Sequence, residues 1–357
     1  MVNDQLPAGK PDLKGLLPEE IAARLEPFGA QAFRGKQLFA WLHRRLAGDF
    51  AAMTDQPQDC RQLLEDNFRL TTLRVKQEHA APDGTVKYLF ELSDGQCIET
   101  VYIPAAHRAT VCVSTQVGCA FRCTFCATGQ SGFTRHLTAA EIVDQVYRVQ
   151  AALPEGRHVT NVVYMGMGEP LANYDNVLRS IRLLTHPLGM NLGQRHLTIS
   201  TVGLVPSIER LVEEGLQVNL AISLHAPTQE GRARLVPIAK KHDLDSLMAA
   251  ARLYVKRTGR KVTFEYTVVP GSNDAPEDAK ALAALVRHLQ CVVNVIPLNP
   301  TEGLPPGMRL HISVLREKAE AFTELLRGHH IEVALRRSRG GEVQGACGQL
   351  RRKAMEE

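Results

Sequence analysis

A repeated alternation between two kinds of segment, which begins at about residue 108, limits the possible folds of this chain most strongly. Short apolar stretches rich in β-branched residues alternate with longer stretches whose apolar residues follow helical spacing. The first pair consists of Thr110–Ser114 and a helix that Thr138 opens, where Glu141 completes a capping box. Such pairs are typical of a parallel sheet covered by helices.

Six pairs of this kind predict an α/β fold, and because a closed barrel needs eight, we expect a partial (β/α)6 barrel. A short seventh strand at 331–335 could follow the last helix. The other predicted strands are 161–165, 196–201, 218–224, 262–269 and 291–297. The other predicted helices are 174–184, 205–214, 243–257, 276–289 and 313–327.

The chain before the alternation divides into two parts of different character. Residues 1–66 show helical spacing and no strand pattern, whereas residues 67–104 show strands separated by Asp-Gly turns. We therefore expect a small helical domain (1–66), a β-strand extension (67–104), the barrel (105–340) and a C-terminal loop (341–357) that carries Cys347.

The composition is that of a globular protein, with 44% hydrophobic and 22% charged residues in 357. No apolar run approaches the roughly 20 residues that a membrane span needs, and residues 1–10 lack the apolar core of a signal peptide. We therefore expect a cytoplasmic protein that does not bind membranes. The net charge of +4 permits nucleic-acid binding but does not predict it.

Three cysteines crowd together directly after the first predicted strand of the barrel. Cys119, Cys123 and Cys126 have a C-x3-C-x2-C spacing. Three thiolates on so short a loop favour a [4Fe–4S] cluster in which one iron keeps an open position. Two alternatives stay open: a zinc site whose fourth ligand is Cys112 or His136, or buried and unreactive cysteines.

Polar and conformationally special residues follow the other predicted strands. In parallel α/β folds, binding sites lie at the carboxyl ends of the strands. Each of these residues alone is typical of a helix cap or a tight turn, but as a set they are candidate ligand contacts. The set comprises Gly168, Glu169, Ser200, Ser223, Leu224, His225 and Asn299.

The cysteine spacing after the first strand of a βα repeat resembles that of the radical S-adenosylmethionine (SAM) superfamily. This resemblance implies one [4Fe–4S] cluster with three cysteine ligands, whose open iron chelates the amino and carboxylate groups of SAM. Gly166–Pro170 resembles the superfamily's glycine-glycine-glutamate segment. Gly168 and Glu169 would then bind the methionine moiety of SAM.

Cys347 stands apart from the cluster, flanked by small residues in a loop near the C-terminus. Such a position suits nucleophilic or redox work, although an incidental exposed cysteine is the alternative. Around it, the chain resembles the bacterial dual-specificity methyltransferases that modify C2 of adenosine in 23S ribosomal RNA and in tRNA. The resemblance runs through 33–37, 99–104, 114–119, 165–171, 223–227, 294–300 and 346–350.

The resemblance implies a reaction that consumes two SAM molecules per turnover. The first methylates Cys347. The second, at the cluster, yields a deoxyadenosyl radical that removes a hydrogen from the S-methyl group, and the resulting carbon radical adds to the adenine. Cys112 then attacks Cys347 to form a transient disulfide and free the product, and Glu99 acts as proton acceptor. From its alternation with Val111 and Val113 alone, Cys112 is better explained as a core residue.

The implied substrates are the peptidyl-transferase centre of 23S ribosomal RNA and the tRNA adenosine 3′ of the anticodon. The basic, aromatic stretch 33–45 is a candidate RNA contact through Arg34, Lys36, Arg44 and Arg45, or simply an amphipathic helix with a solvated basic face. We also expect a monomer that takes electrons from a donor such as flavodoxin and its reductase. The alternatives are methylation at C8 of the same ribosomal adenosine, and a non-catalytic iron–sulfur or zinc protein that binds RNA as a redox sensor.

Overall fold

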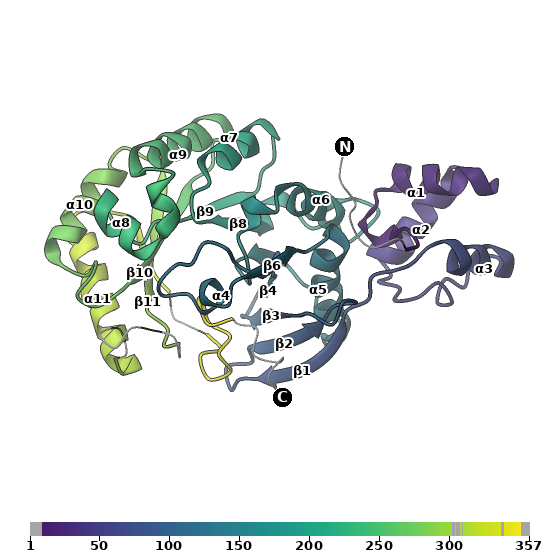
Figure 1. Ribbon diagram of the computed structural model, residues 1–357, viewed down its shortest axis with the longest axis horizontal. Helices are drawn as coiled ribbons and strands as arrows, with labels where there is room; N and C mark the ends of the chain where they lie inside the picture. The colour runs from purple at the N-terminus through teal and green to yellow at the C-terminus, as the bar shows by residue number, and fades with distance from the viewer. Residues whose placement is uncertain (1–8, 302–303, 305–307, 309, 337–338, 351–357) are drawn as a thin grey trace.

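The computed structural model describes residues 9–301, 304, 308, 310–336 and 339–350, and it places most strands in one ten-stranded sheet (Figure 1). The strand order is β1-β2-β3-β4-β7-β8-β9-β10-β11-β12. These strands are β1 (Arg74–Ala80), β2 (Val86–Glu91), β3 (Cys97–Pro104), β4 (Ala109–Cys112), β7 (Asn161–Tyr164), β8 (Leu197–Thr201), β9 (Asn219–Ser223), β10 (Val262–Val268), β11 (Cys291–Pro297) and β12 (Val333–Leu335).

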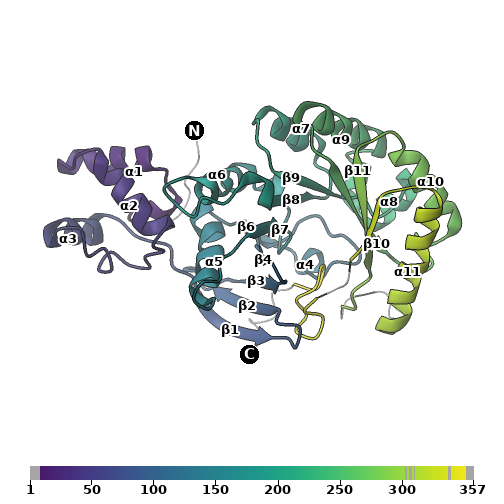
Figure 2. The same cartoon turned by 180° about the vertical axis from the view of Figure 1, so that it is seen from behind.

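Within this sheet, β4, β7, β8, β9, β10, β11 and β12 are parallel. The connecting helices pass along the outside of the curved sheet (Figures 1 and 2). This confirms the predicted α/β class with a partial barrel, to which β12 adds a seventh parallel strand. The helices of the barrel are α5 (Ala139–Ala152), α6 (Tyr174–Thr185), α7 (Val205–Glu213), α8 (Gln229–Leu235), α9 (Leu244–Thr258), α10 (Pro276–Val286) and α11 (Ile312–Gly328).

The β-strand extension continues the barrel sheet instead of forming a separate layer. β1, β2 and β3 are antiparallel to one another, and β3 pairs antiparallel with β4, where Val101 faces Cys112. Residues 99, 101 and 103 of β3 therefore share one face of the sheet with Cys112, because side chains alternate along a strand. This register brings Glu99 onto the same face as Cys112.

Four strands and helices of the barrel were not predicted. A two-stranded sheet pairs β5 (Gln116–Gly118) with β6 (Phe133–His136), and α4 (Ala127–Gln130) lies between them in the chain. These three elements span three or four residues each, which is too short for a hydrophobic period to show. The fourth, α8, has the polar sequence QEGRARL with an internal glycine, so it also lacks an apolar stripe.

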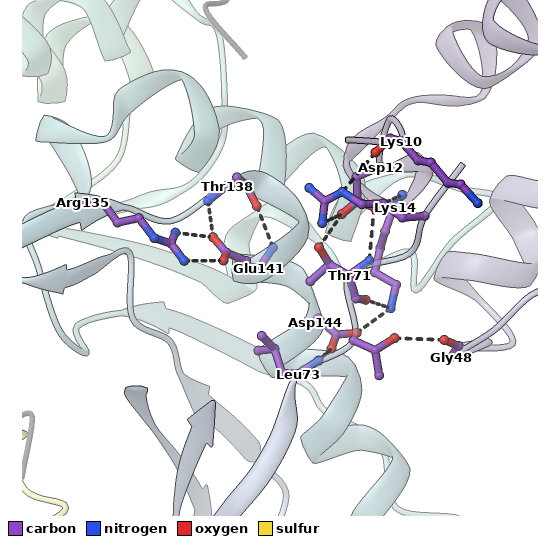
Figure 3. A network of polar contacts seen from close by, with 12 residues as sticks. Lys10, Asp12, Lys14, Gly48, Thr71, Leu73, Arg135, Thr138, Glu141 and Asp144 are labelled. Carbon is purple, nitrogen blue, oxygen red and sulfur yellow. Dashed lines mark hydrogen bonds and ion pairs between the residues drawn. The ribbon is translucent and has the colours of Figure 1, made fainter. Parts of the chain in front are cut away.

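The predicted start of α5 is present (Figure 3). The Thr138 hydroxyl accepts the Glu141 N–H at 3.2 Å, and the Glu141 carboxylate accepts the Thr138 N–H at 2.8 Å. The same carboxylate pairs with Arg135 of β6 at 2.8 Å. The capping box therefore also holds the β5–β6 hairpin against the first barrel helix.

The helical part lies at one end of the molecule, beside α5 and α6 (Figures 1 and 2). Its helices are α1 (Pro18–Leu25), α2 (Phe33–His43) and α3 (Gln58–Asn67). A buried ion pair joins it to the barrel, since the Lys14 ammonium lies 2.7 Å from Asp144 of α5 (Figure 3). Asp144 also accepts the Leu73 N–H at 2.7 Å, so the charge is fully compensated.

Apolar side chains of the helical part and of the barrel form one continuous core, which runs from Leu13 and Phe39 to Phe322 and Leu326. Within it, the buried His43 ring of α2 lies 2.6 Å from the Tyr147 hydroxyl of α5. None of the helices in the described part of the chain is long and apolar enough to cross a membrane.

Candidate functional site

A cavity lies at the carboxyl ends of the parallel strands, as the fold predicts. The cysteine loop forms one wall, and residues after β7, β8, β9 and β11 form the others. The C-terminal segment, yellow in Figure 1, lies close to α4 at this mouth of the barrel. The predicted residues that line the cavity are Cys119, Cys123, Cys126, Gly168, Glu169, Ser200, Ser223, His225, Asn299 and Cys347.

The cysteine loop is held in place by its own backbone. The Cys119 N–H donates to the carbonyl of Gly132, just before β6, at 2.7 Å. The Cys126 N–H donates to the carbonyl of Cys123 at 3.2 Å, and α4 begins immediately afterwards. Burial raises the pKa of Cys119 to about 12 and that of Cys123 well above its usual value. These buried sulfurs thus need a strong electrophile such as iron to ionise.

The three cysteine side chains line one cavity and so can serve one group together. A [4Fe–4S] cluster fits such a set, because it binds each thiolate through a different iron. The fourth ligands of the zinc alternative lie elsewhere: Cys112 lines a second cavity, and His136 contacts Gln116.

The Gly166–Pro170 segment follows β7 and passes directly over the end of β4. A side chain on Gly166 would come within 2.7 Å of the Val113 backbone. Gly168 has a φ of +102°, and a side chain there would meet Gln116 at 2.6 Å. Glycine at both positions therefore lets the segment approach the end of β4 and the start of β5 closely.

Glu169 is buried, and both of its carboxylate oxygens already accept backbone N–H groups, from Leu171 at 3.0 Å and from Val202 at 2.8 Å. Burial raises the pKa of Glu169 to about 7, against the opposite effect of these hydrogen bonds. The carboxylate is thus held rigidly at the cavity wall, with lone pairs left for a ligand ammonium.

The end of β9 contributes His225, whose backbone takes a left-handed φ of 59°. Its Nδ1 accepts the Thr267 N–H at 3.0 Å, and burial lowers its pKa to about 3. The ring is therefore neutral and carries its proton on Nε2. Leu224 differs from the other predicted contacts: it does not line the cavity, because its side chain is fully buried in the core.

Cys347 lines the same cavity, on a loop that is docked onto the start of α4, next to the cysteine loop. The Ala127 N–H donates to the Gly348 carbonyl at 2.8 Å, and the Thr128 hydroxyl donates to the Leu350 carbonyl at 2.6 Å. The side-chain amide of Asn299 donates to the Cys347 carbonyl at 2.9 Å. These three contacts come from segments that are distant from Cys347 in the sequence. Together they hold Cys347 beside the cysteine loop.

A second cavity adjoins the first, and Cys347 lines both. Cys112 lines the second cavity, so the structure brings the two cysteines to one space. Burial raises the pKa of Cys112 to about 12, the nearby Cys347 raises it further, and Arg336 lowers it. Both sulfurs are free thiols here.

Two charged residues lie at these cavities, and sequence reasoning missed one of them, Glu265. Arg336 follows β12 and lines both, while Glu265 of β10 lines the first and accepts the Asn294 amide at 2.8 Å. Cys347, and then Glu265, raise the pKa of Arg336. A glutamate inside an otherwise apolar strand is the signal that could have found Glu265.

Glu99 does not line either cavity. It is buried next to them and pairs with Lys87 at 2.8 Å. The Glu99 side chain lies on the same face of the sheet as the Cys112 side chain, which is the face toward the barrel interior. The Lys87 ammonium compensates the charge of this buried carboxylate.

The predicted RNA contacts lie on and just after α2, far along the molecule from the C-terminal loop (Figure 1). Lys36 and Arg44 are exposed. Arg45 is exposed as well, but it pairs with Asp55 at 3.1 Å. The half-buried Arg34 donates to the Gln37 and Gln56 side chains, so only part of this set is free to meet phosphates.

Comparison with known proteins agrees with this geometry. The chain matches the radical SAM superfamily over residues 113–283 and the ribosomal RNA large subunit methyltransferase N-terminal domain over residues 11–70. A crystal structure of a radical SAM methyltransferase from Sphaerobacter thermophilus superposes with a TM-score of 0.91 at 46% identity, covering 96% of this chain and all of that one.

Curated relatives match over nearly the full length. A probable dual-specificity RNA methyltransferase RlmN of Symbiobacterium thermophilum is 46% identical, over 97% of this chain and 92% of its own. The protein of the same name from Geobacillus kaustophilus is 44% identical, over 97% and 94%. The chain therefore belongs to the RlmN family of dual-specificity RNA methyltransferases within the radical SAM superfamily, whose cofactors are a [4Fe–4S] cluster and SAM.

Proposed function

We propose that this protein methylates C2 of an adenosine in 23S ribosomal RNA and in tRNA, with Cys347 as the intermediate carrier of the methyl group. One observation carries the proposal: Cys347 lines both the cavity of the three clustered cysteines and the cavity of Cys112. A carrier must meet the methyl donor, the radical source and the resolving thiol. Cys347 is placed to meet all three.

Each wall of the first cavity has a proposed task. Cys119, Cys123 and Cys126 hold the cluster, while Gly168 and Glu169 hold the aminoacyl end of SAM. When bound, these groups supply the one-electron cleavage chemistry of the superfamily. Ser200, Ser223 and the Nε2 proton of His225 are free to orient the rest of the SAM molecule.

The second cavity serves the release of product. In the adduct, Cys347 is joined through its methylene group to the adenine. Restoring the aromatic ring releases one electron, which the bound cluster would accept, and the proton of C2, which Glu99 accepts. The Cys112 thiolate then attacks the Cys347 sulfur, which forms a disulfide and breaks the sulfur–carbon bond. The electron pair of that bond stays on carbon, which takes up a proton to become the methyl group.

The remaining parts support the reaction from outside the cavities. Adenine C2 lies on the minor-groove edge of a base, so the RNA must present an unstacked adenosine. We propose that residues 1–66 bind the RNA backbone, that 67–104 extend the sheet behind Glu99, and that 105–340 form the catalytic barrel. A one-electron donor of the flavodoxin type would reduce a monomeric enzyme in the cytoplasm.

Nucleoside mass spectrometry tests the proposal. The protein would be reconstituted anaerobically with iron, sulfide, SAM and reductant, and then given unmodified 23S fragments and tRNA transcripts. We expect 2-methyladenosine in both RNAs, and none with Cys347→Ala. Formation of 8-methyladenosine would replace the C2 assignment. Cleavage of SAM without any methylated RNA would overturn the substrate, and a cluster that never cleaves SAM would favour a binding protein.

A further inference from the structure

Arg232 of α8 is a cation buried without an anion. Its side chain is fully buried. One guanidinium nitrogen, Nη2, donates to the carbonyls of Val202 at 2.5 Å and Ser223 at 3.5 Å. The other two, Nε and Nη1, have no hydrogen-bond partner among the described residues.

Such an arrangement is costly, because a buried charge needs a paired charge as well as hydrogen bonds. Burial lowers the pKa of Arg232 to about 10, so the guanidinium remains charged at neutral pH. No carboxylate in the described part of the chain forms an ion pair with it. The compensating anion is therefore something that the working protein binds.

The position of Arg232 indicates which anion that is. Both carbonyls that it contacts belong to residues that line the cysteine cavity. The Thr124 N–H, next to Cys123, donates to the Leu235 carbonyl of α8 at 3.1 Å. The Cys123 side chain also shares a buried apolar cluster with Leu235 and Val236, which follow Arg232 at the end of α8. α8 thus holds the buried Arg232 next to the part of the cysteine loop that contains Cys123.

We propose that Arg232 is a fixed counter-charge for the iron–sulfur cluster and that it raises the reduction potential of that cluster. The inference rests on the cluster site of the proposed function, but not on its RNA substrate. A nearby cation stabilises the reduced form more, because reduction adds one negative charge, and net charge and burial are among the factors that set such potentials. Arg232 would thereby make the cluster easier for a one-electron donor to reduce.

The test is an anaerobic redox titration of the reconstituted full chain, followed by electron paramagnetic resonance without SAM. For Arg232→Met we expect at least a tenfold lower equilibrium constant for one-electron reduction, which corresponds to a potential about 59 mV lower. Arg232→Lys keeps a charge and should shift the potential less. The matched control is Arg260→Met, since Arg260 also has an unpartnered buried Nε but lies next to Asn219, at the amino end of β9.

A second measurement keeps the inference testable if the cluster loads poorly. Without cluster, Arg232→Met should melt at a higher temperature than the unmodified chain, because an uncompensated buried charge has been removed. In the loaded protein this gain should vanish or reverse. An unchanged potential, or a variant that melts lower with and without cluster, would overturn the inference. A changed affinity for SAM at constant potential would assign Arg232 to the SAM carboxylate instead.

Failure of this inference and failure of the proposed function give different results. If the potential shifts as expected but no 2-methyladenosine forms, Arg232 retains its role and the substrate is wrong. If 2-methyladenosine forms and the potential of Arg232→Met equals that of the unmodified chain, the function stands and the role of Arg232 is wrong.

Discussion

The side-chain amide of Asn299 donates a hydrogen bond to the backbone carbonyl of Cys347 across 2.9 Å. Asn299 follows β11 at the carboxyl end of the barrel, whereas Cys347 belongs to the C-terminal loop. This one contact ties the proposed methyl carrier directly to the rigid sheet. The position of the sulfur therefore depends on a residue that was predicted only as a cofactor contact.

Asn299→Ala should slow methyl transfer to Cys347 by about tenfold to a hundredfold, because displacing a reacting atom by about 1 Å can cost that much. Mass spectrometry of the peptide that contains Cys347, taken over a single turnover, measures the rate. Iron content should be unchanged. Asn219→Ala, at the far end of the barrel, is the control. A rate equal to that of the unmodified chain would show that the Ala127 and Thr128 contacts suffice.

Resolution of the RNA adduct should become faster as the pH rises. Burial raises the pKa of Cys112 to about 12, so at pH 7 the attacking thiolate is a small fraction of the population. That fraction grows about tenfold per pH unit, and the decay of the adduct between pH 7 and 9 should follow it, with a slope near one on a logarithmic scale. Denaturing gels of labelled RNA would show the decay.

Two variants frame this experiment. Cys112→Ala should accumulate the adduct at every pH, because the resolving sulfur is gone. Cys291→Ala removes another buried cysteine, at the start of β11, and should leave the profile unchanged. A decay rate that does not vary with pH in the unmodified chain would mean that another group limits resolution.

The fold should lose stability in mild acid through His43. Burial lowers the pKa of His43 to about 3, whereas the unfolded chain has the ordinary 6.5. Between pH 6.5 and about 3, His43 therefore binds a proton in the unfolded state but not in the folded state. The free energy of unfolding then falls by up to about 1.4 kcal/mol per pH unit as the pH drops toward 4.

Urea denaturation followed by the fluorescence of Trp41, the single tryptophan of the sequence, measures this slope. His43→Gln keeps a polar contact for the Tyr147 hydroxyl and removes the titrating group, so its slope between pH 6.5 and 4 should be smaller. His225 is buried with a similarly low pKa and should account for part of what remains. Equal slopes for both proteins would contradict the assignment to His43.

RNA affinity should depend less steeply on salt when the free charges of α2 are removed. Lys36 and Arg44 are exposed, whereas Arg45 is partly neutralised by Asp55. Lys36→Ala combined with Arg44→Ala should lower the slope of log affinity against log salt by about 0.7 to 0.9 per lost phosphate contact. Lys256→Ala combined with Arg257→Ala, exposed on α9, is the control. An unchanged slope would place RNA binding elsewhere.

Much of the barrel was predictable because each of its main elements is long enough to show a hydrophobic period. α6 and α7 begin at the predicted residues, and the capping box of Thr138 and Glu141 is formed by its own local sequence. The cysteine loop was found because three sulfurs lie within one short segment. These features depend on local sequence alone.

What escaped prediction depends on contacts between distant segments. Arg336 and Glu265 lie 71 positions apart, and only the pairing of β10, β11 and β12 brings them to one cavity. Leu224 follows Ser223 directly, yet the alternation of side chains along the strand turns it into the core. The burial of Arg232 likewise requires α8, which has no periodic pattern of its own.

The continuous core that runs from Leu13 to Leu326 has a consequence for how such enzymes can vary. Since the helices at one end share one apolar core with α5 and α6, they cannot be exchanged for an unrelated module without rebuilding the barrel wall. A destabilising substitution in α2, such as one at Phe39, should lower the melting temperature of the whole molecule in a single transition. The helical end and the barrel are thereby inherited as one unit.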